Sequence, residues 1–176
     1  MEGRIIKALS GYYYVDTGSQ LVTCRARGKF RLDGTSPLVG DRVRLDVSSD
    51  GTGSVRDILP RRNSFIRPAV ANIDLMVMLA AAVNPVTDPF LIDRVSALAE
   101  HHSCGFLLCI NKSDLNRGDE LFSIYSASGI PVLRTSAVTG EGLPELSERL
   151  AGKVCAGGKP YRLCCFVKKI HKEDIR

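Results

Sequence analysis

The sequence predicts a mixed β and α/β protein, in which a small β-barrel precedes an α/β domain built on a parallel sheet. Three observations support this fold class. Residues 1–60 contain five short candidate strands separated by clusters of turn-forming residues. After Pro60, strands alternate with helical segments, which is the pattern of a parallel sheet. The run IDLMVMLAAAV is continuously apolar after Asp74, as expected for a strand covered on both faces.

The first 60 residues supply the strands of the barrel. The candidate strands are GRIIKAL, YYYVD, QLVTCRARG, DRVRLDV and SVRDIL. In the fourth strand apolar residues alternate with charged ones, which predicts an inward face formed by Val43, Leu45 and Val47. Five short strands of this kind favour an OB-fold barrel, which we assign to residues 1–64.

The α/β part is assigned to residues 65–156, and its first helix follows the apolar strand. Asp88 is a candidate helix N-cap, and Pro89 suits the first helical position. The apolar stripe of this helix is predicted to comprise Leu91, Val95, Leu98 and His102.

Two further candidate strands end in polar loops. GFLLCI leads directly into residues 111–114, and PVLR leads into residues 135–137. Helices are expected over about 119–128 and about 144–150, before a short strand around Cys155. Since ligands of open parallel sheets bind at the carboxyl ends of strands, the two loops form a candidate site.

The loop sequences NKSD and, about 20 residues later, TSA are typical of guanine recognition in GTP-binding domains. Guanine presents its N1 hydrogen and 2-amino group side by side, and one carboxylate, that of Asp114, can accept both. An ordinary polar turn is the alternative interpretation of NKSD. The predicted guanine-binding residues are Asn111, Lys112, Ser113, Asp114, Ser136 and Ala137.

Each of the other residues has an expected contact with the base. Asn111 can reach the acceptors on the opposite base edge or fasten the two loops together. The methylene stem of Lys112 can lie across the base plane, and the backbone N–H near Ala137 can serve the 6-oxo group. No catalytic residue and no metal ligand is predicted.

The order of the motifs predicts a circular permutation. The phosphate loop GxxxxGK[ST] normally precedes NKxD, whereas the barrel occupies that place here. Together with RPAVANIDLMVMLAAAVNP and SGIPVLRTSAVTGEGLPEL, the motifs give residues 1–156 a sequence that resembles the RsgA (YjeQ) family of ribosome-associated GTPases. The resemblance implies an OB domain before a permuted P-loop-type GTPase domain, GTP or GDP with Mg²⁺ as ligands, and the small ribosomal subunit with its 16S rRNA as partner.

The resemblance is lost in residues 157–176. Gly157-Gly158-Lys159 is superficially similar to a phosphate loop, but Pro160 stands where Ser or Thr should bind Mg²⁺. We therefore expect a partial, truncated GTPase domain that lacks the phosphate loop and does not hydrolyse GTP alone. The zinc that the resemblance implies for a C-terminal domain is not expected in this chain.

The charge distribution suggests a polyanionic partner. Residues 1–70 hold 12 Lys and Arg against 7 Asp and Glu, whereas residues 71–150 hold 5 against 10. A solvated charged surface is the common alternative. Near the third strand, alternating cations predict an RNA-binding face with Phe30 available for stacking. These cations are Arg25, Arg27, Lys29 and Arg31.

Six cysteines without CxxC spacing predict buried or free thiols, and a zinc site at Cys164, Cys165 and His171 is the weaker alternative. No apolar stretch reaches the roughly 20 residues of a membrane span, so we expect a cytoplasmic protein without membrane or DNA partners. Two other functions remain open. The alternatives to a truncated GTPase are an RNA-binding module with a passive α/β part and a non-functional remnant with an unprotected sheet edge.

Overall fold

The computed structural model describes residues 1–28, 30, 34–158 and 168–169. The chain divides into two compact units, Met1–Asn72 and Ile73–Arg176. The sequence analysis places this boundary earlier, near residue 65.

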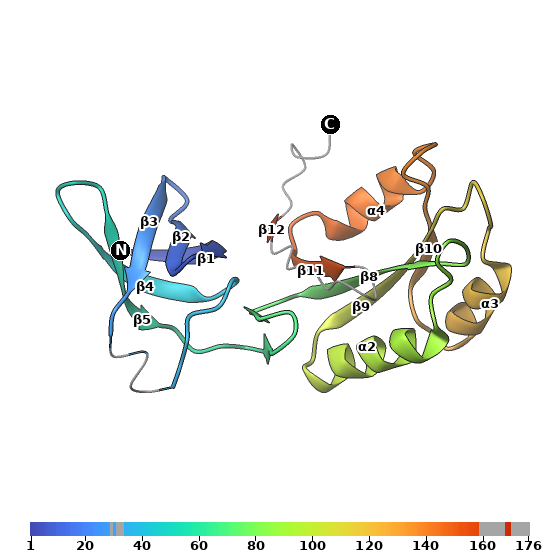
Figure 1. Ribbon diagram of the computed structural model, residues 1–176, viewed down its shortest axis with the longest axis horizontal. Coiled ribbons are helices and arrows are strands. Elements are labelled where there is room, and N and C mark those ends of the chain that lie inside the picture. Colours follow the sequence, from blue (N-terminus) through green and yellow to red (C-terminus); the bar gives the residue numbers. More distant parts are fainter. Residues whose placement is uncertain (29, 31–33, 159–167, 170–176) are drawn as a thin grey trace. The chain divides into compact units, whose positions relative to one another are not determined.

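The first unit contains a closed five-stranded barrel (Figure 1). Its strands are β1 (Glu2–Leu9), β2 (Tyr12–Asp16), β3 (Leu21–Ala26), β4 (Arg42–Val47) and β5 (Gly53–Ile58). They follow the order β1-β2-β3-β5-β4, and β4 closes the barrel on β1. β3 and β5 are parallel, and the other neighbours are antiparallel. This arrangement confirms the predicted OB-fold barrel.

Mostly small and aliphatic side chains fill the barrel, because a ring of five strands leaves room for little else. Along β4, Val43 and Leu45 point inward while Arg42 and Arg44 are exposed, as the alternation predicts. Val47 departs from this pattern and is 39% exposed, because it is the last residue of the strand. The core comprises Ile5, Val15, Val22, Cys24, Phe30, Val43, Leu45 and Val55.

The residues after β5 belong to the same compact unit as the barrel. They include a short antiparallel pair of strands, β6 (Ser64–Phe65) and β7 (Val70–Ala71). Val70 is fully buried and forms a bridge to Val39. The side-chain amide of Asn72 donates to the carbonyl of Gly40 at 3.2 Å. These contacts explain why the unit continues to Asn72.

A buried ion pair also holds this segment. The Asp41 carboxylate is fully buried and accepts from the Arg61 guanidinium, with 2.8 Å between Nε and Oδ1. The hydrogen bond to Asp41 raises the pKa of Arg61, so the guanidinium stays charged. The same carboxylate accepts from the backbone N–H of Leu38 at 2.7 Å. Arg61 therefore fixes the chain where it leaves the barrel.

The second unit contains a five-stranded sheet with helices on both faces (Figure 1). Its strands are β8 (Leu75–Ala81), β9 (Gly105–Asn111), β10 (Val132–Arg134), β11 (Val154–Gly158) and β12 (Lys168–Lys169). The order is β10-β9-β8-β11-β12, and only β12 runs antiparallel to its neighbour. β11 thus pairs with β8 on one side and, at Val154 and Cys155, with β12 on the other.

Successive side chains of the strands enter two separate cores. Met78 and Ile110 pack with α2 (Pro89–His101) and α3 (Asp119–Ala127), whereas Val77 and Cys109 pack with α4 (Leu143–Leu150). A strand covered on both faces needs apolar residues at every position. This arrangement explains the uninterrupted apolar runs, and it confirms the predicted α/β class.

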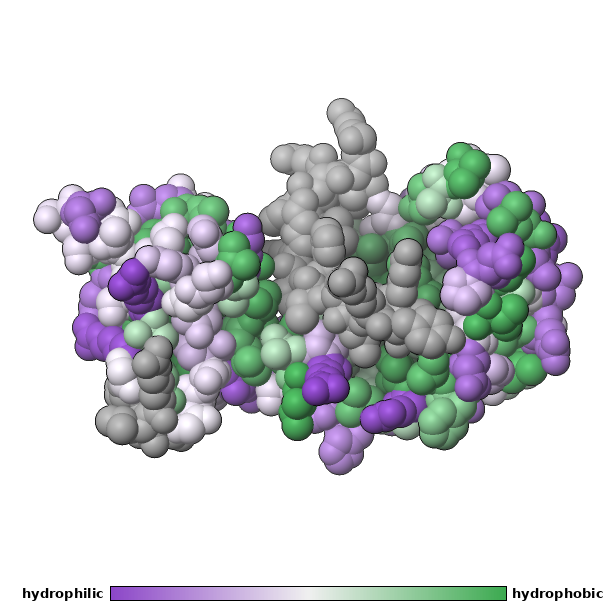
Figure 2. Space-filling model, in the orientation of Figure 1, coloured by the Kyte–Doolittle hydropathy of each residue, from purple (hydrophilic) through white to green (hydrophobic). Residues whose placement is uncertain are grey.

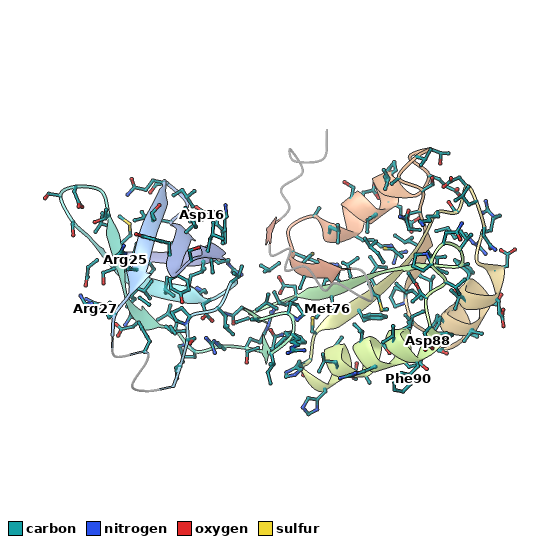
Figure 3. The ribbon with its side chains drawn as sticks, in the orientation of Figure 1. Asp16, Arg25, Arg27, Met76, Asp88 and Phe90 are labelled. Carbon is teal, nitrogen blue, oxygen red and sulfur yellow. The ribbon has the colours of Figure 1, made fainter. Side chains whose placement is uncertain are left out.

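The first helix begins as the sequence predicts. The side chain of Asp88 accepts from the backbone N–H of Phe90 at 2.9 Å, and Figure 3 shows both residues at the start of α2. The most buried residues of α2 are Ile92 and Ala99. Leu91 and Val95 of the predicted stripe are partly buried against the core, so the buried face is displaced from the predicted stripe but overlaps it. The difference arises because α2 packs over both β8 and β9. Within the described ranges, no helix combines the length and the apolar character that crossing a bilayer requires.

Candidate functional site

The polar loops after β9 and β10 lie side by side because the two strands pair in parallel. Arg134, the last residue of β10, is opposite Ile110. The backbone N–H of Thr135 donates to the carbonyl of Ile110 at 2.9 Å, and that of Ser113 donates to the carbonyl of Thr135 at 3.1 Å. Two loops that are 20 residues apart in sequence are thus joined directly at the carboxyl edge of the sheet.

A hydrogen bond joins Asp114 to Ser136. Ser136 is fully buried, and its hydroxyl donates to Oδ1 of Asp114, which is exposed. The same hydroxyl accepts from the backbone N–H groups of Val138 at 3.3 Å and Thr139 at 3.1 Å. Since a hydroxyl has one hydrogen to donate, these two amides direct it toward Asp114. The carboxylate is therefore held in place at the surface.

Asn111 and Lys112 connect the site to neighbouring segments. The hydroxyl of Thr135 donates to Oδ1 of Asn111 at 3.4 Å, so Asn111 contacts the second loop. The Lys112 ammonium donates to the backbone carbonyl of Asn84, in the loop that follows β8. Lys112 has a left-handed backbone with φ of 65°, which turns the chain at the end of β9.

Glu141 is a member of this cluster that the sequence analysis missed. Ser113 is buried, and its hydroxyl donates to Oε2 of Glu141 at 2.7 Å. Arg117 approaches the other carboxylate oxygen at 3.4 Å. The signal available in the sequence was Thr-Gly-Glu-Gly, a turn of the kind that returns toward the preceding loop. Ala137, which lies between these contacts in the chain, is exposed.

The surface near the site mixes hydrophilic and apolar side chains. In Figure 1 the carboxyl ends of β9 and β10 and the helix α3 lie at one end of the second unit. Figure 2 shows both kinds of side chain over this end, and Leu115 and Val138 are among its exposed apolar residues. Such a surface suits a ligand with an apolar face and hydrogen-bonding edges.

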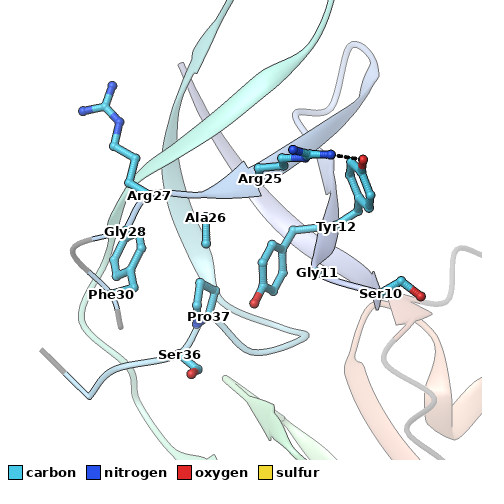
Figure 4. Close-up of a pocket in the computed structure, with 11 residues that line it drawn as sticks. Ser10, Gly11, Tyr12, Arg25, Ala26, Arg27, Gly28, Phe30, Ser36 and Pro37 are labelled. Atoms are coloured by element: carbon cyan, nitrogen blue, oxygen red, sulfur yellow. Dashed lines mark hydrogen bonds between the residues drawn. The ribbon is translucent and has the colours of Figure 1, made fainter. Parts of the chain in front are cut away.

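The predicted RNA-binding cations are described only in part. Arg25 donates a hydrogen bond to the hydroxyl of Tyr12, and its guanidinium lies 4.6 Å from the centre of that ring. Arg27 points away from Arg25 and pairs with Asp46 at 2.7 Å (Figures 3 and 4). Lys29 and Arg31 lie outside the described residues. Phe30 packs against the barrel core and is only 8% exposed, and it also lines the pocket beside Arg25, so its stacking role stays a prediction.

A pocket of about 510 Å³ lies beside Arg25 on the barrel (Figure 4). Its walls come from the turn between β1 and β2, from the end of β3, and from the segment Ser36–Pro37. Tyr12 and Tyr13 supply aromatic surface, and Arg25 supplies positive charge. Aromatic rings together with a cation suit the stacking of a nucleobase near a phosphate.

The described cysteines serve packing. Cys24, Cys104, Cys109 and Cys155 are buried thiols outside any disulfide, as predicted, whereas Cys164 and Cys165 lie outside the described residues. Burial raises the pKa of Cys109 to about 12 and that of Cys155 to about 11. Such thiols remain protonated at neutral pH and are poor nucleophiles. Within the described part of the chain, no three His, Cys, Asp or Glu residues are grouped as metal ligands.

Sequence comparisons match both units to one family. The RsgA N-terminal domain matches residues 2–55, and the RsgA GTPase domain matches residues 58–157. A small ribosomal subunit biogenesis GTPase RsgA of Caldanaerobacter subterraneus is 39% identical, over 88% of this chain and 53% of the relative. The protein of the same name from Clostridium perfringens is 36% identical, over 98% of this chain and 63% of the relative. The chain therefore spans little more than half the length of these relatives.

Solved structures show the same architecture. YjeQ from Thermotoga maritima has a TM-score of 0.75 and 33% identity, and the match covers 89% of this chain and 59% of that one. YloQ, a circularly permuted GTPase, has a TM-score of 0.70 and 32% identity, with 90% and 59% covered.

Proposed function

Because this chain belongs to the RsgA family of GTPases, we propose that its second unit recognises guanine nucleotides and that the protein acts in small ribosomal subunit biogenesis. The observation that carries the proposal is the hydrogen bond between Ser136 and Asp114, which presents a carboxylate at the carboxyl edge of a parallel sheet. The name of the relatives supports the biological role.

The residues present fit a guanine base. Asp114 has two acceptor oxygens and would accept the N1 hydrogen and the 2-amino group. Adenine lacks this pair of donors on one edge, so the site would discriminate between the two purines. Asn111 would help to hold the two loops, the Lys112 stem would cover one face of the base, and the backbone at Ala137 would face the 6-oxo group.

The residues present fit the guanine base better than they fit the phosphates and Mg²⁺ of a nucleotide. The sequence contains no GxxxxGK[ST] motif, and Pro160 follows Lys159 where a hydroxyl-bearing ligand of Mg²⁺ would stand. Phosphoryl transfer depends on a phosphate cradle and the metal ion. We expect these 176 residues to bind the base weakly and not to hydrolyse GTP.

Titration of the ¹⁵N-labelled chain with GMP, followed by NMR, tests the guanine site. We expect shifts of the backbone signals of residues 111–114 and 135–137, with an affinity in the millimolar range. AMP at the same concentrations is the control and should leave those signals unchanged. Equal responses to GMP and AMP would remove the basis for the assignment. Release of phosphate from GTP by the purified chain would contradict the expected lack of hydrolysis.

A second proposal concerns the barrel, which we infer to contact rRNA of the small subunit. Its support is the pocket beside Arg25, where aromatic side chains and a guanidinium meet. Binding of the full chain to 16S rRNA, measured against salt concentration, tests it. Arg25→Ala should weaken binding and reduce the slope against log salt by about 0.7–0.9 if one phosphate contact is lost. The exposed Arg94 in the other unit supplies the control, Arg94→Ala, and equal effects of the two changes would refute the assignment.

A further inference from the structure

Glu141 occupies the junction between the two loops of the proposed base site. Its carboxylate accepts from the Ser113 hydroxyl at 2.7 Å, and Ser113 is only 5% exposed. Its backbone carbonyl accepts from the N–H of Ser136 at 3.0 Å. Glu141 therefore contacts Ser113, which precedes Asp114 in the chain, through its side chain. Through its backbone it contacts Ser136, the hydrogen-bond partner of Asp114.

The backbone around Glu141 is shaped for this position. Gly140 and Gly142 both have left-handed backbones, with φ of 83° and 70°. A Cβ atom on Gly142 would lie 2.0 Å from the carbonyl oxygen of Arg134, so the turn packs directly against the end of β10. This close approach fixes the backbone of Glu141 beside Ser113, while its side chain remains 40% exposed.

The negative charge of Glu141 also contributes to its contacts. The second carboxylate oxygen faces the Arg117 guanidinium at 3.4 Å, so the two oxygens contact different partners on the first loop. A carboxylate oxygen is a stronger acceptor for a buried hydroxyl than a neutral group is. Without the Glu141 carboxylate, the Ser113 hydroxyl would lose this acceptor. The side-chain hydrogen bond between Ser113 and the turn at Glu141 would then be absent.

We propose that Glu141 is a positioning residue for guanine specificity, which acts by holding Ser113 so that Asp114 faces the 2-amino group of the base. The inference rests on the proposed guanine site and adds a residue to it. Glu141 itself would not touch the nucleotide. Its effect should therefore appear in the discrimination between bases more than in the binding of the common ribose phosphate.

The comparison of GMP with IMP isolates this role, since IMP lacks only the 2-amino group. We expect the wild-type chain to prefer GMP about tenfold in NMR titrations, as the loss of one hydrogen bond to a carboxylate predicts. Glu141→Ala should reduce the preference to about threefold or less. Glu141→Gln keeps an acceptor oxygen for Ser113 and should restore most of the preference for GMP.

Ser113→Ala should reduce the preference for GMP as much as Glu141→Ala does. The double variant should show no further reduction, because the two groups act as one contact.

Glu145→Ala is the matched control, because Glu145 lies on the exposed side of α4 and pairs with Arg149 instead. It should leave the preference for GMP unchanged. An unchanged preference in Glu141→Ala, with the fold retained, would overturn the role of Glu141 while leaving the guanine site intact. Failure of the wild-type chain to bind GMP at all would overturn the guanine site and this inference together.

Discussion

At the scale of single residues, the site depends on where one hydrogen points. The Ser136 hydroxyl accepts from two backbone amides, so its own hydrogen is directed to the Asp114 carboxylate. Asp114 in turn lies at the surface, where a ligand can reach it. A buried hydroxyl thus orients an exposed carboxylate, as the proposed acceptor for a base requires.

The exchange of this carboxylate for an amide should change the preferred base. Asp114→Asn places an N–H donor where an acceptor stood, so GMP binding should weaken by about tenfold or more. XMP carries an oxygen in place of the 2-amino group and should bind better to the variant than GMP does. NMR titrations with both nucleotides measure the change, and Asp16→Asn on the barrel is the control. An unaltered order of GMP over XMP would show that Asp114 does not read the base.

The buried thiols predict a loss of stability at high pH. Burial raises the pKa of Cys109 from 9.0 to about 12, so the folded state binds more protons than the unfolded state between these values. The contribution of the protonated Cys109 thiol to the free energy of unfolding is complete below pH 9. It declines as the pH rises toward 12, by roughly 1 kcal/mol per pH unit. Urea unfolding of the reduced chain between pH 8 and 10.5 measures it. Cys109→Ala should show a shallower decline, whereas parallel curves would contradict the assignment.

At the scale of elements, strand register decides which loops meet. β9 and β10 are parallel and paired at their carboxyl ends, so residues separated by a whole helix become neighbours. α3 spans that separation, and Arg134 at the end of β10 fastens to its first residue, Asp119, at 2.6 Å. The same guanidinium lies 3.8 Å from the ring centre of Phe122. These contacts of Arg134 join α3 to the end of β10 and so stabilise the start of the loop after β10.

The turn around Glu141 should tolerate no side chain at Gly142. Gly142→Ala combines a left-handed backbone with a Cβ 2.0 Å from a carbonyl oxygen, and should lower the free energy of unfolding by about 2–4 kcal/mol. Gly129→Ala is the matched control, because Gly129 has a similar φ of 77° with no atom near its Cβ position. It should cost only about 1 kcal/mol. Urea unfolding compares the two, and equal losses would mean that backbone strain alone, without the close contact, sets the cost.

At the scale of the whole molecule, the chain consists of two units with different chemistry. The barrel buries one apolar core and presents exposed arginines such as Arg42 and Arg44, while the α/β unit has two cores, one on each face of its sheet. The proposed RNA contact and the proposed guanine site belong to different units.

The position of the boundary between the units predicts which barrel fragment is stable. A fragment of residues 1–72 keeps Val70 on Val39 and Asn72 on Gly40, whereas a fragment of residues 1–64 loses both contacts. We expect the longer fragment to be more stable by about 2–4 kcal/mol, since burial of one Val side chain and the buried hydrogen bond contribute most of the difference. Urea unfolding of the two fragments measures this. Equal stability would favour the earlier boundary near residue 65.

The sequence by itself determined the class of each unit and located the two loops of the proposed base site. Short alternating strands, uninterrupted apolar runs and the pair NKSD and TSA are local patterns, because burial on one or both faces and turn chemistry depend on residues close in the chain. The helix cap at Asp88 is equally local and appears as predicted.

Only the tertiary structure decided the contacts made between distant segments. The role of Glu141 depends on a turn folding back onto a loop 28 residues earlier, and the extent of the first unit depends on Val70 reaching Val39. Phe30 shows the same limit, since whether an aromatic ring faces solvent or a barrel core depends on the path of the chain around it. Such long-range pairings carry no periodic signal in the sequence, because packing rather than local conformation selects them.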